Sequence, residues 1–391
     1  MAWLIDRVWL LISRFLFSKI PQYSVRIPPD DTETTVDSEN AQYFVQDFLS
    51  GRRNRPQSDP FLQELYDAAL ENRLSADHLA EVTRNHGTDL ALLLLHAQIE
   101  NRPENKRIQQ VSDHFRELEN WEPPQSSDYP HIAIVPGWMY EKLPDTGADL
   151  REQRTILEEL GIDHTFVETE DDSSVEDNAA IVDQVVTKLA TNSKPLLVLS
   201  CSKGGSETAL AIGRMERRGS LAIRGWWNVS GIILGTPIAD RLDHWSIRWY
   251  AKRVFVRNGW GKNWESVSSM CRERSRQRFR EIRFPESLPI VNHVALPLSG
   301  LVTPEGFEGY RWTRDLGPTD TTSLITDQLI PNSATLSEFG LDHRLRSPNM
   351  RKNFVASLFA VLWYCDLLPP KVTKQFSILS QQHRCDPQQE N

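Results

Sequence analysis

The sequence PLLVLSCSKGG, residues 195–205, contains the change of pattern that decides the fold. Its first half is an apolar run that predicts a buried strand, and apolar residues at helical spacing resume at once in ETALAI, residues 207–212. A strand, a sharp turn and a helix in direct succession are typical of a nucleophile elbow, which lifts a hydroxyl clear of the backbone. Ser202 stands at the turn and is the candidate nucleophile.

The residues around Ser202 have to be small, because strand and helix nearly touch across such a turn. The usual pattern is Gly-x-Ser-x-Gly; here Ser200 replaces the first glycine, Gly204 is the second, and Gly205 adds room. A tight turn with an unreactive serine fits the same residues. Serine is a poor nucleophile on its own, so the elbow interpretation requires a base and an orienting acid elsewhere in the chain.

Length and composition restrict the class of protein. At 391 residues the chain can bury a large core, as one big domain with additions. Its net charge of −9 argues against nucleic acid as a partner, because a nucleic-acid-binding surface would be basic. The 4 cysteines are widely spaced and form no CxxC pair, which favours a reducing compartment and a cytoplasmic protein. Cys201 is a rival nucleophile, but strand alternation predicts that it points into the core.

Residues 1–24 form an apolar stretch interrupted by Asp6, Arg7 and Arg14. The stretch is too short and too interrupted for a comfortable transmembrane helix, and it lacks the basic start and cleavage site of a signal peptide. On a helical wheel the polar positions leave a wide apolar face. This pattern fits an interfacial helix with which residues 1–20 contact a membrane peripherally, or a helix packed on the protein or in a dimer.

The next segments differ in composition. Residues 25–40 are mostly polar and include PPDD, so we expect a linker. From residue 41 to residue 125 apolar side chains recur at helical spacing without a strand pattern, which predicts a helical N-terminal region. The histidines of this region lack metal-ligand spacing, and we expect no metal site.

The period changes after the prolines at 123–130. Between residues 126 and 370 short apolar runs alternate with helical segments. This alternation predicts the α/β class, with a doubly wound, mostly parallel sheet that is covered by helices on both faces. Sites in such sheets form at the carboxyl ends of strands, where Ser202 lies. The expected strands are 131–135, 164–167, 196–199, 225–229, 289–296 and 334–336.

The alternation stops between about residues 239 and 286. This part is aromatic and then arginine-rich, and it predicts a helical cap whose aromatic side chains bind an apolar acyl chain. The arginines between 272 and 283 fit a solvated helix face, or a surface for an anionic headgroup or membrane. The polar residues 371–391 predict a disordered tail. The aromatic residues in question are Trp245, Trp249, Tyr250, Phe255, Trp260 and Trp264.

A base and an acid are available downstream. Asp320 ends GPTD, residues 317–320, and His343 ends GLDH, residues 340–343; each follows a predicted strand. Asp320 also fits a simple turn residue, and His343 a surface histidine. Asp327 and Asp342 are competing acids, although Asp342 would have to fold back awkwardly to pair with its neighbour His343. His293 is a competing base, but it lies inside a strand-like run.

Together these motifs resemble the α/β-hydrolase superfamily, on its lipase/esterase side. The resemblance covers residues 131–363 and is carried by IVPG (134–137), SCSKGG (200–205), GPTD (317–320) and GLDH (340–343). The order Ser…Asp…His is the one expected of that superfamily. The helical residues before residue 123 have no counterpart in it, and Ser200 departs from its usual elbow.

The resemblance implies a role for each residue. His343 would take the proton of Ser202, and Asp320 would orient the imidazole. The backbone N–H of Lys203, with one from Trp138 or Met139, would hold the oxyanion, while the Lys203 side chain is expected to point to solvent. The implied protein is a serine hydrolase that cleaves small-molecule or lipid carboxylic esters without a metal or cofactor.

Two alternatives remain open at this point. The same three residues would serve an acyltransferase or a thioesterase, which differ only in the acceptor or the substrate bond. A catalytically silent scaffold of the same fold would instead use its helical N-terminal region to bind a partner or a membrane.

Overall fold

The computed structural model describes residues 22–27, 32–48, 60–118, 121–261, 263–347 and 349–373. Its centre is a six-stranded sheet of order β4-β3-β5-β6-β7-β8, in which every neighbouring pair is parallel. The predicted fold class is therefore confirmed, and each expected strand is present. The strands are β3 (His131–Val135), β4 (His164–Phe166), β5 (Leu196–Cys201), β6 (Gly225–Val229), β7 (Ile290–Leu296) and β8 (Ala334–Phe339).

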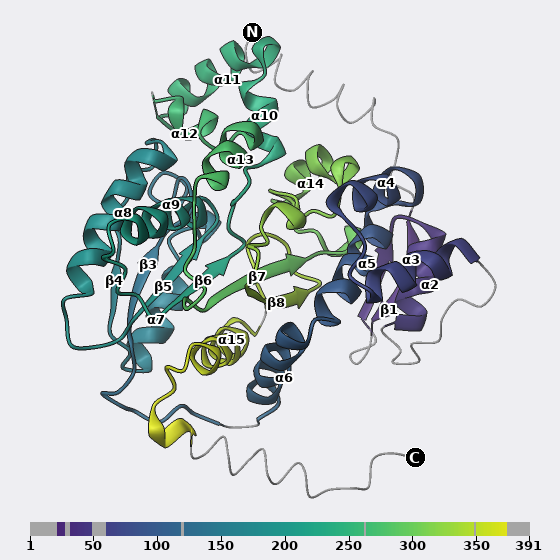
Figure 1. Ribbon diagram of the computed structural model, residues 1–391. Helices are drawn as coiled ribbons and strands as arrows, with labels where there is room; N and C mark the ends of the chain where they lie inside the picture. Colours follow the sequence, from purple (N-terminus) through teal and green to yellow (C-terminus); the bar gives the residue numbers. More distant parts are fainter. Residues whose placement is uncertain are drawn as a thin grey trace, which may run out of the picture.

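Helices cover both faces of the sheet (Figure 1). Successive residues of a strand point to opposite faces. Leu196 and Val198 of β5 therefore pack toward α8 (Val175–Leu189) and α9 (Lys203–Arg217), whereas Leu197 and Leu199 belong to the core on the other face. That second face is covered by α6 (Pro103–Glu117), α7 (Arg151–Glu159) and α15 (Met350–Tyr364).

The position of α6 moves a predicted boundary. Its side chains Ile108, Val111 and Phe115 share the core of α15 and the sheet, so α6 is a layer of the α/β domain. The predicted helical region, residues 41–125, is thus divided. Its first helices form a separate cluster with α5 at the centre, and this cluster packs on Val294 and Leu296 of β7. These helices are α2 (Glu39–Phe48), α3 (Pro60–Leu70), α4 (Ala76–His86) and α5 (Thr88–Glu100).

The linker predicted at residues 25–40 is wrong. β1 (Tyr23–Ile27) and β2 (Thr32–Val36) pair in antiparallel register, with Tyr23 opposite Val36. Val25 and Val36 are buried in the cluster of α2–α5 and Thr34 is also buried, whereas Ser24, Arg26 and Glu33 are exposed, so the strands have one solvated face. The amphipathic helix expected at residues 1–24 lies almost entirely outside the described residues, as does most of the tail at 371–391.

Four helices lie between β6 and β7, where the cap is expected. Figure 1 shows them grouped beyond the carboxyl ends of the strands. Within the described parts of the chain, no helix combines the length and the apolar character needed to cross a bilayer. The four helices are α10 (Pro237–Asp243), α11 (Trp245–Arg257), α12 (Glu265–Ser268) and α13 (Arg272–Arg280); α14 (Phe307–Thr313) follows β7.

The arginines of α13 do not form a freely solvated face. Arg278 is buried and binds Glu176 of α8 at 2.8 Å, and Arg276 pairs with Asp327 at 3.2 Å. The helix carries so many cations because carboxylates of neighbouring elements face it. The other pairs of this set are Arg272–Asp240, Arg274–Glu176 and Arg274–Glu265.

Candidate active site

The turn between β5 and α9 holds Ser202 in an unusual backbone conformation, with φ 51° and ψ −121°. A residue other than glycine adopts such angles only where the surroundings impose them. The N–H of Ser202 donates to the carbonyl of Val229 at 3.0 Å, and its own carbonyl accepts from Ile232 at 2.9 Å. These bonds to the segment after β6 fix the turn and present the hydroxyl at the end of the sheet.

Glycine is required after the turn. A Cβ atom on Gly204 would lie 2.4 Å from the carbonyl oxygen of Pro136, and one on Gly205 would lie 2.5 Å from Oδ1 of Asn228. Real Cβ atoms do not approach backbone or rigid side chains so closely. The close approach of strand and helix that the small residues at 200–205 predicted is therefore present.

Ser200, which departs from the usual glycine, has a structural role of its own. It is fully buried, and its hydroxyl accepts a hydrogen bond from Nε1 of Trp226 at 2.8 Å. Trp226 is also fully buried, in the neighbouring strand β6. The serine therefore satisfies an indole N–H that would otherwise be unpaired in the core.

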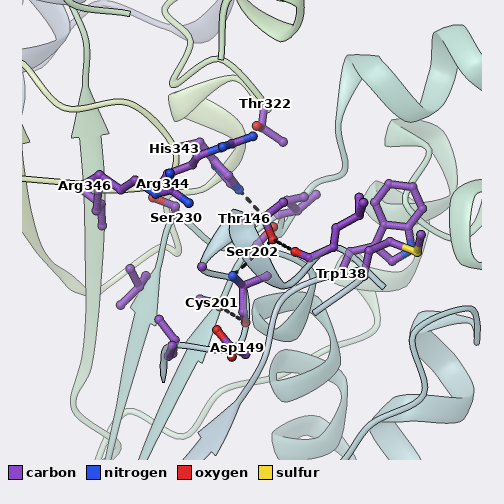
Figure 2. Close-up of a pocket in the computed structure, with 18 of the residues that line it drawn as sticks. Trp138, Thr146, Asp149, Cys201, Ser202, Ser230, Thr322, His343, Arg344 and Arg346 are labelled. Atoms are coloured by element: carbon purple, nitrogen blue, oxygen red, sulfur yellow. Dashed lines mark hydrogen bonds between the residues drawn. The ribbon is translucent and has the colours of Figure 1, made fainter. Parts of the chain in front are cut away.

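The structure brings the three candidate residues together. Nε2 of His343 lies 3.0 Å from the hydroxyl oxygen of Ser202, and Nδ1 lies 2.6 Å from Oδ2 of Asp320. Figure 2 shows the imidazole directed toward Ser202, with Trp138 on the other side of the serine. Ser202 follows β5, Asp320 lies between β7 and β8, and His343 follows β8, so one end of the parallel sheet supplies all three.

Asp320 is held rigidly by its own turn. It is fully buried, and its Oδ1 accepts hydrogen bonds from the N–H groups of Thr322 and Ser323 at 2.9 Å and 2.8 Å. Oδ2 accepts a third from Nε2 of Gln328 at 2.7 Å, besides its contact with His343. Four donors to one carboxylate fix its position and orientation. Gln328 could not be predicted from the sequence, because a lone amide side chain belongs to no recognisable motif.

The pKa of His343 lies above its usual value. Burial alone lowers the pKa of this imidazole and is the largest effect, but it is outweighed by the charge and hydrogen bond of Asp320 and by the charge of Asp342. The imidazole is thus placed to accept a proton and to be stabilised as a cation.

The competing residues are engaged elsewhere. Asp342 accepts from the N–H and hydroxyl of Thr303, and Asp327 pairs with Arg276. His293 lies in β7 with its Nε2 3.4 Å from Oε1 of Glu338. Burial raises the pKa of the Cys201 thiol to about 12, so no reactive thiolate forms there at neutral pH. As expected, Cys201 packs in the core beneath the elbow.

Two of the three residues expected to supply the oxyanion donors, Trp138 and Met139, line the same cavity. Lys203 is the first residue of α9, so its backbone N–H has no partner within the helix. Trp138 and Met139 line the cavity beside Ser202, and Met139 has a positive φ of 61° that turns the loop after β3. The assignment of Lys203 with Trp138 or Met139 stays a prediction.

The side chain of Lys203 does not point to solvent, and that expectation is wrong. It is 2 % exposed, and its Nζ lies 2.9 Å from Oε1 of Glu207 and 2.8 Å from the carbonyl oxygen of Ser173. Asn178 of α8 donates to the same Glu207 oxygen at 2.8 Å. A lysine and a glutamate four residues apart usually form a surface pair, so the burial of this pair could not be predicted from the sequence.

The Lys203–Glu207 pair belongs to a network that joins the start of α9 to the loop before α8 and, through it, to the segment after Met139. The loop that supplies the Ser173 carbonyl also supplies Asp171, whose carboxylate accepts from the N–H of Lys142 at 2.9 Å. In the same way the hydroxyl of Tyr140 donates to the carbonyl of Thr169 at 2.6 Å. The segment after Met139 and the start of α9 are therefore held by one loop.

A cavity of about 670 Å³ opens beside Ser202. The loop after β3 and the cap form one apolar wall of it, without the aromatic residues expected to bind an acyl chain, while Leu199, Trp227 and Phe354 line the cavity from β5, β6 and α15. Trp245 and Trp249 are instead exposed to solvent, while Phe255 packs on Trp264. The apolar residues of this wall are Trp138, Ile238, Ala239, Leu242, Val267 and Met270.

The sheet order, the strand–turn–helix at Ser202 and the loops that carry Asp320 and His343 define the α/β-hydrolase fold. This chain has that fold. A metagenomic carboxyl esterase matches with 19% identity and a TM-score of 0.51, covering 64% of this chain and 79% of the esterase. At such identity the likeness shows the fold alone.

Two further solved structures match more loosely. The mature form of a lipase from Bacillus licheniformis has 16% identity and a TM-score of 0.48, covering 62% of this chain and 94% of the lipase. Mouse α/β hydrolase domain-containing protein 10 has 10% identity and a TM-score of 0.37, covering 61% of this chain and 91% of the mouse chain. No family model matches the sequence, and no curated protein matches it.

Burial of the Lys203–Glu207 pair predicts how substitutions there change the free energy of unfolding. Lys203→Met leaves the Glu207 carboxylate buried without its cation, so the free energy of unfolding should fall by about 3–5 kcal/mol. The double variant Lys203→Met/Glu207→Leu removes both charges and should recover most of that loss. Urea denaturation of the three proteins measures both effects. A double variant as unstable as Lys203→Met would show that packing, not the unpaired charge, is responsible.

Proposed function

We propose that this protein is a serine hydrolase that cleaves carboxylic esters through an acyl-enzyme on Ser202. The observation that carries the proposal is the position of His343, within hydrogen-bond distance of both the Ser202 hydroxyl and the Asp320 carboxylate. Ser202 lies more than a hundred residues before Asp320 and His343 in the chain, and structural packing alone does not require it to meet them.

The chemistry follows from these distances. Ser202 Oγ attacks the ester carbonyl while Nε2 of His343 takes its proton, and the imidazolium is stabilised by Asp320. The oxyanion is held by the N–H of Lys203 with that of Trp138 or Met139. Collapse expels the alcohol, which receives the proton from Nε2. Water then attacks the acyl carbonyl and gives a proton to the same nitrogen. Collapse breaks the bond from Ser202 Oγ to the acyl carbon, releases the acid, and returns the proton from Nε2 to Oγ.

The substrate class is inferred from the cavity. Its wall of apolar side chains from the cap, including Ile238 and Leu242, suits the acyl chain of a small-molecule or lipid ester. An acyltransferase or thioesterase would use the same three residues. Product analysis with competing alcohol, thiol and water acceptors distinguishes these activities from ester hydrolysis.

A fluorophosphonate probe tests the proposal directly, because it labels only an activated serine. The full chain should be labelled, and Ser202→Ala should abolish labelling completely while its thermal unfolding stays that of the wild type. Ser220→Ala, a serine away from the cavity, serves as the matched control and should label normally. Folded wild-type protein that takes no label would favour the catalytically silent scaffold instead.

The raised pKa of His343 predicts the shape of the pH profile. Only neutral imidazole can accept the Ser202 proton, so kcat/KM for a water-soluble ester should fall with decreasing pH, with a midpoint above 6.5. Asp320→Asn removes the charge that raises this pKa. The midpoint should therefore move to lower pH, and kcat should drop by roughly 10⁴-fold because the imidazole loses its orientation.

A midpoint that stays in place in Asp320→Asn would contradict this assignment of the acid. Asp327→Asn is the matched control: it changes a carboxylate that pairs with Arg276 and that lies outside the Ser202–His343–Asp320 chain. Its midpoint should be that of the wild type.

A further inference from the structure

The cap helix α11 presents an unusual outer face to solvent. Trp245 and Trp249 are 83% and 68% exposed, and Val256 is 55% exposed. At about 100° per residue these three side chains fall within an arc of about 40°. Ala251 and Phe255 on the opposite side pack into the cap core with Trp264. We call the exposed set, with Tyr250, Arg253 and Arg257, the outer face of α11.

Large aromatic side chains in this number are not expected on a free surface. Single exposed apolar residues are normal, but tryptophans clustered on one helix face mark a surface that is covered in use. These side chains contribute nothing to the cavity beside Ser202, since they do not line it. Figure 1 shows α11 at the edge of the molecule, on the outer side of α10, α12 and α13.

The charge of α11 is opposite to that of the chain. The protein as a whole carries −9, yet α11 contains four basic residues and no acidic one. Arg248 is paired with Asp243 at 3.1 Å. Lys252, Arg253 and Arg257 have no carboxylate partner in the part of the chain that the structure describes, and Arg253 lies over the ring of Trp249 at 5.1 Å. The outer face of α11 therefore combines aromatic rings with unneutralised cations.

We propose that the outer face of α11 docks on an anionic lipid bilayer. Tryptophan and tyrosine suit the boundary between headgroups and acyl chains, because their rings are apolar and their N–H or O–H is polar. Arginine and lysine on the same helix are attracted to anionic headgroups. A helix that lies in the plane of the interface needs only this one face.

The shape of the surface favours a bilayer over a protein partner. A protein interface is built around a central apolar patch with a hydrogen-bonding rim, and its aromatic anchors fill pockets. Here the apolar side chains and the cations share one projecting helix. Such a ridge inserts readily into headgroups, to a depth of about 5–10 Å.

Docking through α11 would place the cap against the lipid. The preceding helix α10 contributes Ile238, Ala239 and Leu242 to the wall of the cavity and packs on α11. The docking surface is thus separated from the cavity by one layer of helix. The proposal concerns binding alone and stands whether or not Ser202 is a nucleophile.

The test is flotation of the full chain with vesicles of phosphatidylcholine, with and without phosphatidylserine. The wild type should float with the anionic vesicles, and added salt should weaken binding. Trp245→Ser/Trp249→Ser should lower the partition coefficient at least tenfold, by loss of buried aromatic area. Arg253→Gln/Arg257→Gln should lower it about fivefold per charge removed, on anionic vesicles only.

Matched controls keep the test specific. Phe307→Ser/Leu316→Ser removes two exposed apolar side chains from another surface and should float like the wild type. Residues 1–24 are present in every variant, so their contribution is constant. Thermal unfolding of each variant shows that the fold is retained.

Three results would overturn the proposal. Wild-type protein that floats with neither vesicle does not dock on a bilayer. A tryptophan variant that floats like the wild type places binding elsewhere in the chain. A wild type that ignores vesicles but self-associates through these tryptophans, as shown by light scattering of both proteins, would identify a second copy of the chain as the partner.

Discussion

The close contact between β5 and α9 is the constraint on which the rest of the molecule depends. Gly204 lies against the backbone of Pro136, and Gly205 lies against Asn228 of β6 and the backbone of Gly231, so the segments that follow β3 and β6 pack directly on the turn. This packing imposes the backbone angles of Ser202, and those angles leave its side chain no place except the end of the sheet. A larger residue at Gly204 would push the turn away from the end of β3, and one at Gly205 would push it away from the end of β6.

Two separate groups of buried charged residues lie near that turn. Above it, Asp320 is fully buried, holds four donors and faces His343. Beneath it, Lys203 and Glu207 form an ion pair sealed from water, whose further bonds reach α8 and the loop before it. Buried ions stabilise a fold weakly but are costly to separate, so they fix geometry rather than add stability. The site is therefore rigid although its parts come from distant segments.

Much of this architecture could be predicted from sequence, because the signals are local. Buried parallel strands are continuous apolar runs, and the serine, aspartate and histidine follow such runs in a recognisable order. The hairpin β1–β2 was missed because its strands are short and mostly polar, with Val25, Thr34 and Val36 buried, and flank PPDD, which resembles a linker. Burial of the Lys203–Glu207 pair was missed because Ser173, which accepts from Lys203, and Asn178, which donates to Glu207, come from α8 and the loop before it. Contacts of that kind leave no trace in one sequence.

The bond between Ser200 and Trp226 has a consequence for how such chains diverge. The serine hydroxyl and the indole N–H lie on adjacent strands and satisfy each other out of reach of water. A glycine at position 200 would leave the buried indole N–H of Trp226 without an acceptor, whereas a phenylalanine at position 226 would leave the serine hydroxyl with only its bond to Asn228 at 3.5 Å. Related sequences should therefore change the two positions together. A pattern that demands glycine before the serine would overlook every relative that kept the pair.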